Sequence, residues 1–319
     1  MGDIDAHQHF WHPKRGDYPW MPMDDPILAR PYHPGDLSDD LDAAGVEATV
    51  LVQAAPTVAE TDYLLGIADT TPYVAKIVGW IDFEDRSQAS VLERLAAHPK
   101  FAGVRPMIQD IADDAWMLRD DVQWAYAAIV DLDLTFDCLG FPRHLGRFHT
   151  LLTRHPDMRA VIDHCMKPQF RTHSAKSLRA WANGMSALAR DTQAFCKLSG
   201  LVTEADKAWS DDILAPYADH VVESFGPERV MWGSDWPVAR LRCGYGDWHA
   251  QARRLTRHFG DAAQNHIFGE TARRFYRLHQ AIETTGRFAE NVVLRGIPEV
   301  TGQPAGLCVP IPIPATKPR

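Results

Sequence analysis

The sequence lacks the features that mark several common protein classes. Its 319 residues include five cysteines, an odd number, scattered along the chain without a CxxC pair, so we expect neither a disulfide framework nor a structural zinc knuckle. It contains no run of about 18 apolar residues, which a membrane-spanning helix needs, and no basic segment followed by an apolar one at its start, which would mark a secretory signal. These absences predict a cytoplasmic protein in a reducing compartment.

Positive charge is also scarce. The chain has 33 Lys and Arg residues against 42 Asp and Glu, a formal net charge of -9 at pH 7. Binding to nucleic acid or to an anionic membrane requires clustered positive charge that displaces counterions. We therefore expect no nucleic-acid or membrane partner, and predict a small-molecule substrate.

The sequence does contain a regular alternation of short apolar runs with stretches of helical periodicity. Helical patterns begin near Ser87, Asp121, Ser177 and Asp211. Such alternation is typical of βα units that carry a parallel sheet, and eight units close a (β/α)₈ TIM barrel in the α/β class. An open, doubly wound sheet is the alternative, but no GxGxxG motif follows the first run to favour it. The eight predicted strands cover residues 4–10, 48–55, 74–83, 101–108, 134–139, 159–165, 194–201 and 229–235.

Two segments fall outside this repeat. Residues 11–35 hold six prolines with aromatic residues between them, which predicts a long irregular first βα loop that could cover a site. Residues 284–319 end in PAGLCVPIPIPATKPR and are predicted to form an extended Pro-rich tail, packed on the surface or used in contact between subunits of a homo-oligomer. We therefore expect a single barrel domain over residues 1–283.

Nearly every predicted strand finishes with a polar side chain. In the first strand, DIDAHQHFW, the side chains of Asp5, His7 and His9 share one face because strand residues alternate. Catalytic residues of TIM barrels lie at the carboxyl ends of the strands. The other strand ends supply Gln53, Asp82, Arg105, Asp137, His164, Ser199 and Asp235.

Closure of the barrel would bring three of these residues together. The eighth strand pairs with the first in a closed barrel, so Asp235 should lie beside His7 and His9. Two imidazoles and one carboxylate, with a position left open for water, are the ligands that a catalytic zinc ion uses. The pattern therefore predicts one divalent metal ion, zinc, held by His7, His9 and Asp235.

Five motifs, IDAHQHFW, GVRPMIQD, VIDHCMKP, KLSGL and MWGSDWP, resemble the amidohydrolase superfamily. Within it they are similar to the sugar lactone hydrolases of the fuconolactonase and rhamnonolactonase type, a group that also includes the pyrone-dicarboxylate lactonases. The resemblance runs from about residue 3 to residue 280 and implies that His7, His9, His164 and Asp235 are site residues. Members with a bridged metal pair have a lysine ending strand 4 and a histidine ending strand 5, and this chain has neither. The resemblance thus implies one metal ion or metal-free catalysis.

The activity that this resemblance implies is hydrolysis of a sugar-acid 1,4-lactone, such as an L-fucono- or L-rhamnono-lactone, to the aldonate. Asp235, near His164, would take a proton from the attacking water. The oxyanion that forms would be stabilised by zinc, or by the cations Arg105 and Lys167. Sugars are held by aromatic faces and hydrogen-bonding side chains, and the residues predicted to bind substrate are Trp11, Gln53, Lys167 and Trp236.

Other functions and other roles for these residues stay open at this point. A pyrone-dicarboxylate or muconolactone-type lactonase would need several cations, which Arg105, Arg143, Arg147, Arg171 and Arg240 could supply. A metal-dependent decarboxylase is disfavoured by the missing strand 5 histidine, and a non-catalytic sugar-acid binding barrel by the many ionisable strand ends. Arg105 could instead pair with Asp82, Gln53 could bond only to backbone groups, and the two tryptophans could serve packing.

Overall fold

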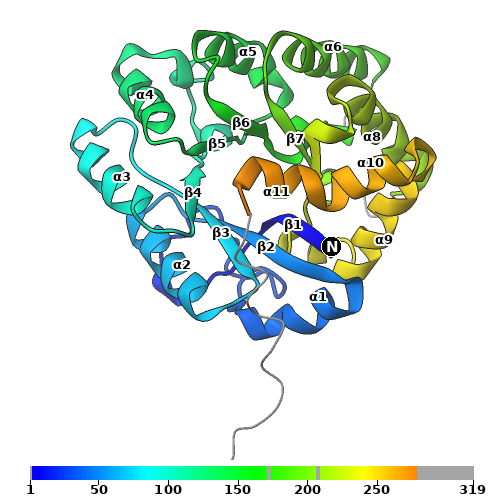
Figure 1. Cartoon of the computed structure of the whole chain (residues 1–319), viewed down its shortest axis with the longest axis horizontal. Helices are drawn as coiled ribbons and strands as arrows, with labels where there is room; N and C mark the ends of the chain where they lie inside the picture. The colour runs from blue at the N-terminus through cyan, green and yellow to red at the C-terminus, as the bar shows by residue number, and fades with distance from the viewer. Residues whose placement is uncertain (1, 171–173, 206–208, 279–319) are drawn as a thin grey trace, which may run out of the picture. The chain divides into compact units, whose positions relative to one another are not determined.

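In the computed structural model, eight parallel strands form the centre of the protein and helices surround them (Figure 1). The structure describes residues 2–170, 174–205 and 209–278. The strands pair in chain order from β1 to β8, which confirms the TIM-barrel prediction. They are β1 (Asp3–Gln8), β2 (Val46–Val52), β3 (Val74–Gly79), β4 (Phe101–Val104), β5 (Thr135–Cys138), β6 (Arg159–Ile162), β7 (Phe195–Leu198) and β8 (Val230–Trp232).

The seam between β8 and β1 is held by the backbone just beyond β8. Asp235 N donates to His7 O over 2.8 Å, and His9 N donates to Trp236 O over 2.7 Å. The Asp5 carboxylate accepts a further hydrogen bond across the seam, from Ser234 N at 2.8 Å. The sheet thus forms a nearly closed barrel, and the seam fixes residues 7, 9 and 235 side by side.

The helices form the outer layer because each buries one apolar face against the strands. In α5 (Leu145–Arg154), for example, Leu145, Phe148, Leu151 and Leu152 are buried, a spacing that places them on one side of a helix. All four helices predicted from the sequence are present, as α3, α4, α6 and α8. The helices are α1 (Ser38–Ala44), α2 (Val58–Thr70), α3 (Ala89–Ala96), α4 (Gln123–Asp131), α5, α6 (Ala175–Asp191), α7 (Leu201–Glu204), α8 (Asp211–Phe225), α9 (Tyr245–Thr256), α10 (Asp261–Asn265) and α11 (Thr271–Tyr276).

Helix α11 covers the amino ends of the strands. Figure 1 shows it lying across the barrel in front of the strands. Phe275 in α11 packs its ring against Phe195, the first residue of β7, and its carbonyl accepts a hydrogen bond from Arg159, the first residue of β6. Helix α11 therefore leaves the carboxyl ends of the strands, at the opposite end of the barrel, uncovered for a functional site.

The strands end several residues earlier than the apolar runs predicted, so most of the polar strand ends lie in the loops that follow. Two of these loop residues adopt left-handed backbone conformations that are rare for residues other than glycine: φ is 52° at His164 and 55° at Asp235. Such conformations are unfavourable by about 1 to 2 kcal/mol and occur preferentially at functional sites.

The predicted first loop is ordered by its aromatic residues. Trp11 and Tyr32 pair through their backbones in an isolated antiparallel β-bridge. The Trp11 indole N–H donates to the carbonyls of Leu28 and Arg30. Tyr18 in the same loop is buried. Across the described ranges, no helix has both the length and the apolar character required to span a membrane. The predicted domain boundary at residue 283 and the Pro-rich tail lie outside the described residues.

Candidate active site

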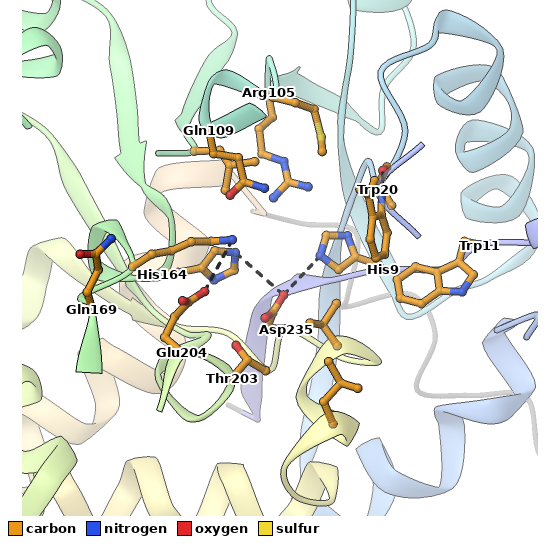
Figure 2. A pocket seen from close by; sticks show the side chains of 16 residues that line it. His9, Trp11, Trp20, Arg105, Gln109, His164, Gln169, Thr203, Glu204 and Asp235 are labelled. Carbon is orange, nitrogen blue, oxygen red and sulfur yellow. Dashed lines mark hydrogen bonds and ion pairs between the residues drawn. The ribbon is translucent and has the colours of Figure 1, made fainter. Parts of the chain in front are cut away.

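A cavity of about 500 Å³ opens at the carboxyl ends of the strands (Figure 2). Its floor contains His9 after β1, Arg105 after β4, His164 after β6 and Asp235 after β8. The remaining lining residues come from the loops: Trp11, Trp20, Ala54, Met107, Gln109, Leu139, Lys167, Gln169, Thr203, Glu204, Val238 and Leu241.

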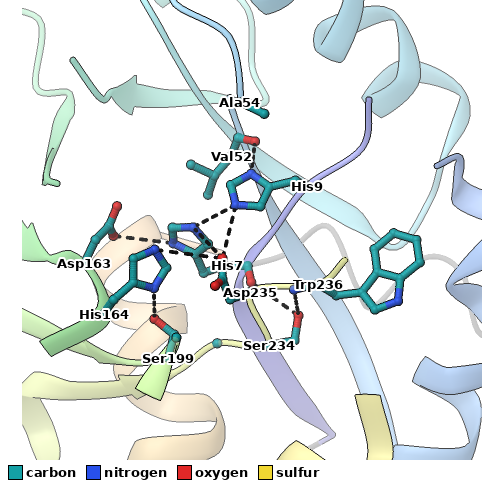
Figure 3. A network of polar contacts seen from close by, with 12 residues as sticks. His7, His9, Val52, Ala54, Asp163, His164, Ser199, Ser234, Asp235 and Trp236 are labelled. Atoms are coloured by element: carbon teal, nitrogen blue, oxygen red, sulfur yellow. Dashed lines mark hydrogen bonds and ion pairs between the residues drawn. The ribbon is translucent and has the colours of Figure 1, made fainter. Parts of the chain in front are cut away.

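Three imidazoles converge on the Asp235 carboxylate (Figure 3). Asp235 Oδ1 lies 3.4 Å from His9 Nε2 and 3.9 Å from the Nε2 atoms of both His7 and His164. The Nε2 atoms of His7 and His9 are 3.2 Å apart. The structure therefore brings together the four residues that the sequence placed at one site.

Hydrogen bonds behind the imidazoles fix how two of them point. His9 Nδ1 is 2.8 Å from the carbonyl of Val52, and His164 Nδ1 is 2.9 Å from the hydroxyl of Ser199. Each bond leaves Nε2 directed toward Asp235. A second group that fixes the Nδ1 side of an imidazole is typical of catalytic and metal-binding histidines.

The protonation states follow from burial and from these neighbours. Burial lowers the pKa of His164 to about 4 and also lowers the pKa values of His7 and His9. Burial alone would raise the pKa of Asp235, but the imidazoles of His164, His9 and His7 hold it well below its usual range. At neutral pH the site therefore holds neutral imidazoles around a carboxylate anion.

This donor set fits one zinc ion. One atom each of His7, His9 and Asp235 lies within 4.8 Å of the others. Ligand atoms bound tetrahedrally to zinc at about 2.0–2.1 Å are about 3.3 Å apart. The separations of 3.2 Å and 3.4 Å at His9 match that value, and the His7 Nε2–Asp235 Oδ1 separation of 3.9 Å is wider. Neutral imidazoles and an ionised carboxylate are also the forms that bind a metal ion.

A layer of buried charges lies beneath this cluster. Arg105 Nη1 pairs with Asp163 Oδ2 at 3.2 Å, so its carboxylate partner is Asp163 and not Asp82. Lys197, which is fully buried, contacts Asp137, Asp163 Oδ1 (3.0 Å) and His7 Nδ1 (3.1 Å). Burial would lower the pKa of Lys197, but the two carboxylates raise it, so the side chain stays an ammonium ion.

Sequence reasoning named neither Lys197 nor Asp163 as site residues. Lys197 lies inside the apolar run AFCKLSGL, where a single lysine suggests a side chain that reaches solvent. The available signal was its spacing from Ser199, because residues two apart in a strand share a face and Ser199 was already placed at the site. Asp163 lies directly before His164, and the sequence prediction named only the histidine of this pair as a site residue.

Two of the predicted substrate-binding residues do not line the cavity. Gln53 is fully buried, and its amide donates to the backbone carbonyl of Arg105 over 2.6 Å. Trp236 is also fully buried, with its ring packed against Phe10 and Tyr32. Both side chains are enclosed by the protein, so the structure corrects these two predictions.

The other two predicted substrate-binding residues, Trp11 and Lys167, do line the cavity. Lys167 Nζ lies 3.8 Å from a Glu204 carboxylate oxygen. The sequence prediction missed Trp20, whose indole N–H donates to Ala54 O over 2.6 Å and whose ring stands beside His9 (Figure 2). Trp20 lies in the Pro-rich loop, where no periodicity indicates which side chains turn inward.

Comparison with known proteins agrees with this geometry. A family model described as Amidohydrolase matches residues 4–278, and the chain belongs to this family. The L-fucono-1,5-lactonase of Burkholderia ambifaria is 41% identical over 281 residues, covering 86% of this chain and 95% of that protein. The L-fucono-1,5-lactonase of Burkholderia multivorans is 34% identical over 288 residues, covering 86% of this chain and 96% of that protein.

A solved structure supports the same grouping. The crystal structure of an amidohydrolase from Burkholderia multivorans with bound zinc superposes with a TM-score of 0.81 at 34% identity, covering 87% of this chain and 99% of that one. That relative therefore accommodates zinc on the same fold.

Proposed function

We propose that this protein is a lactonase that opens the ring of a neutral sugar-acid lactone, and that its substrate is of the L-fucono-1,5-lactone type. The observation that carries the proposal is the convergence of His9, His164 and Asp235 on the floor of a cavity at the carboxyl ends of the strands. The 41% identity to a lactonase across almost the whole of that enzyme supports it.

In the proposed reaction, the Asp235 carboxylate takes a proton from a water molecule in the cavity, and the water oxygen attacks the lactone carbonyl carbon. The ring C–O bond then breaks, and the proton on Asp235 passes to the departing ring oxygen. A carboxylate with a low pKa is a weak base, which suits an ester carbonyl better than the less electrophilic carbonyl of an amide.

The developing negative charge on the carbonyl oxygen needs a positive partner in the cavity. Arg105 reaches the floor while its guanidinium is held by Asp163, so it is already oriented before substrate binds. A zinc ion on His7, His9 and Asp235, when bound, would polarise the carbonyl in the same way.

The charges on the cavity wall favour a neutral lactone over a dicarboxylate. Among the described lining residues, the cations are Arg105 and Lys167, and each has a carboxylate beside it, Asp163 and Glu204 respectively. Arg143, one of the cations that could have bound a dicarboxylate substrate, pairs with Asp114 instead. A substrate with two carboxylates would therefore meet Glu204 and Asp235 without an unpaired cation among the described lining residues. Arg171, also named for that alternative, lies outside the described residues.

The size of the lactone ring separates our proposal from the sequence-based prediction. The sequence prediction named a 1,4-lactone, whereas both lactonase relatives carry the 1,5 ring in their names. We therefore propose the six-membered ring.

Ring opening releases a proton at neutral pH, so a pH indicator follows it directly. We expect freshly prepared L-fucono-1,5-lactone to be hydrolysed faster than its 1,4 isomer, and both faster than a pyrone dicarboxylate. Preferred turnover of the dicarboxylate would contradict the proposal. Saturable binding of lactones without proton release would instead indicate a binding protein.

A further inference from the structure

Lys197 is an unusual residue for the inside of a barrel. Its side chain extends from β7 into the closed interior, and none of it is exposed to solvent. It cannot reach the cavity contents, yet it contacts His7, one of the three residues whose donor set fits zinc. Its effect on the site therefore has to pass through a neighbouring side chain, and His7 is the neighbour that belongs to this donor set.

The ammonium group of Lys197 has three N–H donors, and the structure shows two hydrogen bonds from it, to Asp137 Oδ2 and, over 3.1 Å, to His7 Nδ1. Asp163 Oδ1 lies 3.0 Å away as an ion-pair partner. An atom that accepts a hydrogen bond carries no proton, so the contact with His7 Nδ1 places the single proton of the neutral His7 ring on Nε2.

The contacts on the other side of the ring agree with that assignment. His9 Nδ1 bonds to a backbone carbonyl, which can only accept, so His9 carries its proton on Nδ1 and its Nε2 is an acceptor. The 3.2 Å contact between the two Nε2 atoms then needs a proton from His7. Lys197, His7, His9 and the Val52 carbonyl form one continuous chain of hydrogen bonds.

The opposite tautomer fits less well. With its proton on Nδ1, His7 would point an N–H at the Lys197 ammonium over 3.1 Å and face the His9 lone pair over 3.2 Å. Its compensating bonds would be the longer ones, to Asp163 Oδ1 at 3.4 Å and from Arg105 Nη1 at 3.3 Å. With the proton on Nε2, the Arg105 Nη1 contact of 3.3 Å is no longer a hydrogen bond, but the same nitrogen keeps its bond to Asp163 Oδ2 over 3.2 Å.

We propose that Lys197 is a positioning residue that keeps the His7 proton on Nε2 and thereby weakens metal binding at this site. A zinc ion binds a lone pair on the nitrogen, so ligation through His7 Nε2 requires the proton to move to Nδ1 and the Lys197 hydrogen bond to be lost. The ammonium charge beside the ring opposes the metal charge as well. This inference rests on the site geometry and does not depend on which lactone is the substrate.

The direct test is ¹⁵N NMR of the metal-stripped protein with labelled histidine, since the shifts of the two ring nitrogens show which one carries the proton. The His7→Gln variant assigns the signal by its loss. We expect His7 with Nδ1 unprotonated and Nε2 protonated. A His7 ring protonated on Nδ1 would overturn the proposal.

The second test is zinc affinity, measured by competition with a chromogenic chelator. Lys197→Met alone would leave two buried carboxylates facing each other, so the variant of choice is the double Asp137→Asn/Lys197→Met, which removes one charge of each sign. We expect it to bind zinc at least about tenfold more tightly than the wild type, since the opposing ammonium is gone.

Lys100→Met serves as the matched control, because Lys100 bonds to backbone carbonyls away from the cavity. Its zinc affinity should equal that of the wild type. Unchanged or weaker zinc binding in a folded double variant would contradict the proposal. If the double variant does not fold, the NMR result on the wild-type protein decides the question.

Discussion

Gln53 and Arg105 hold each other in place through reciprocal hydrogen bonds to their backbones. The Gln53 amide donates to the Arg105 carbonyl over 2.6 Å, and the Arg105 guanidinium donates to the Gln53 carbonyl. Both side chains are almost completely buried. The Gln53 side chain therefore holds the backbone of Arg105 in place, and the Gln53 backbone carbonyl holds the Arg105 guanidinium.

We expect Gln53→Ala to lower the free energy of unfolding by about 1 to 3 kcal/mol, because it leaves the buried Arg105 carbonyl without its donor. It should lower kcat more than it raises KM. Urea denaturation and steady-state kinetics measure the two effects. Gln109→Ala, on the cavity wall, is the control. It should change KM, and its free energy of unfolding should stay within about 0.5 kcal/mol of the wild-type value. A change in KM alone for Gln53→Ala would mean that Gln53 binds the substrate after all.

Replacing Asp235 with Asn tests its role as the base. The amide has nearly the shape of the carboxylate but cannot take the proton from water, so kcat should fall by about 10²- to 10⁴-fold. Circular dichroism should show an unchanged fold. Asp82→Asn, after β3 and away from the lining residues, should keep wild-type kcat. Turnover by Asp235→Asn near the wild-type rate would contradict the proposed mechanism.

Substitution of Trp20 should affect substrate binding, whereas substitution of Trp236 should affect stability. Trp20→Leu removes an aromatic face beside His9, so we expect KM to rise about tenfold while kcat changes little. Trp236→Leu should instead lower the free energy of unfolding by about 3 kcal/mol, because the ring is fully enclosed. Kinetics and thermal unfolding of both variants decide this. Equal KM increases in the two would show that the enclosed ring also reaches the substrate.

Glu60, which does not itself line the cavity, gives the protein a pH-dependent stability. Burial raises the pKa of Glu60 to about 8, although backbone N–H groups of Ala55 and Ala54 partly offset this effect. Between its ordinary pKa of 4.5 and about 8, the folded protein keeps a proton that the unfolded chain releases. This stabilisation is complete below the ordinary pKa of 4.5 and is lost progressively as pH rises through about 8.

We therefore expect wild-type stability, measured relative to Glu60→Gln, to fall by about 3 to 5 kcal/mol between pH 5 and pH 9. Urea denaturation at several pH values gives the difference, and the Gln variant supplies the control because it does not titrate. A difference that stays constant over this range would show that Glu60 is ionised in the folded protein.

The sequence was sufficient to predict the barrel because the information for it is local. Each strand is a short apolar run and each helix has its own period, so no knowledge of distant contacts is required. The meeting of His7 and His9 with Asp235 could also be predicted, because ring closure alone makes the first and last strands neighbours.

The remaining features depend on pairs that no local pattern reveals. The sequence suggested Asp82 as a carboxylate partner for Arg105, and only the folded arrangement shows that the partner is Asp163. Lys197 was missed because a lysine in a strand normally reaches water, and its burial depends on Asp137 in β5 and on Asp163, directly after β6. Trp236 was predicted to bind substrate because aromatic faces hold sugars, but its ring is buried against Phe10 and Tyr32.

The hydrogen bonds from Asp235 N to His7 O and from His9 N to Trp236 O lie where the two ends of the barrel meet. The reactive centre therefore takes His7 and His9 from the first strand region and Asp235 from the last, so neither half of the polypeptide contains all of it. Catalysis can arise only after the last strand has docked onto the first, so recovery of activity during refolding would report that final docking step.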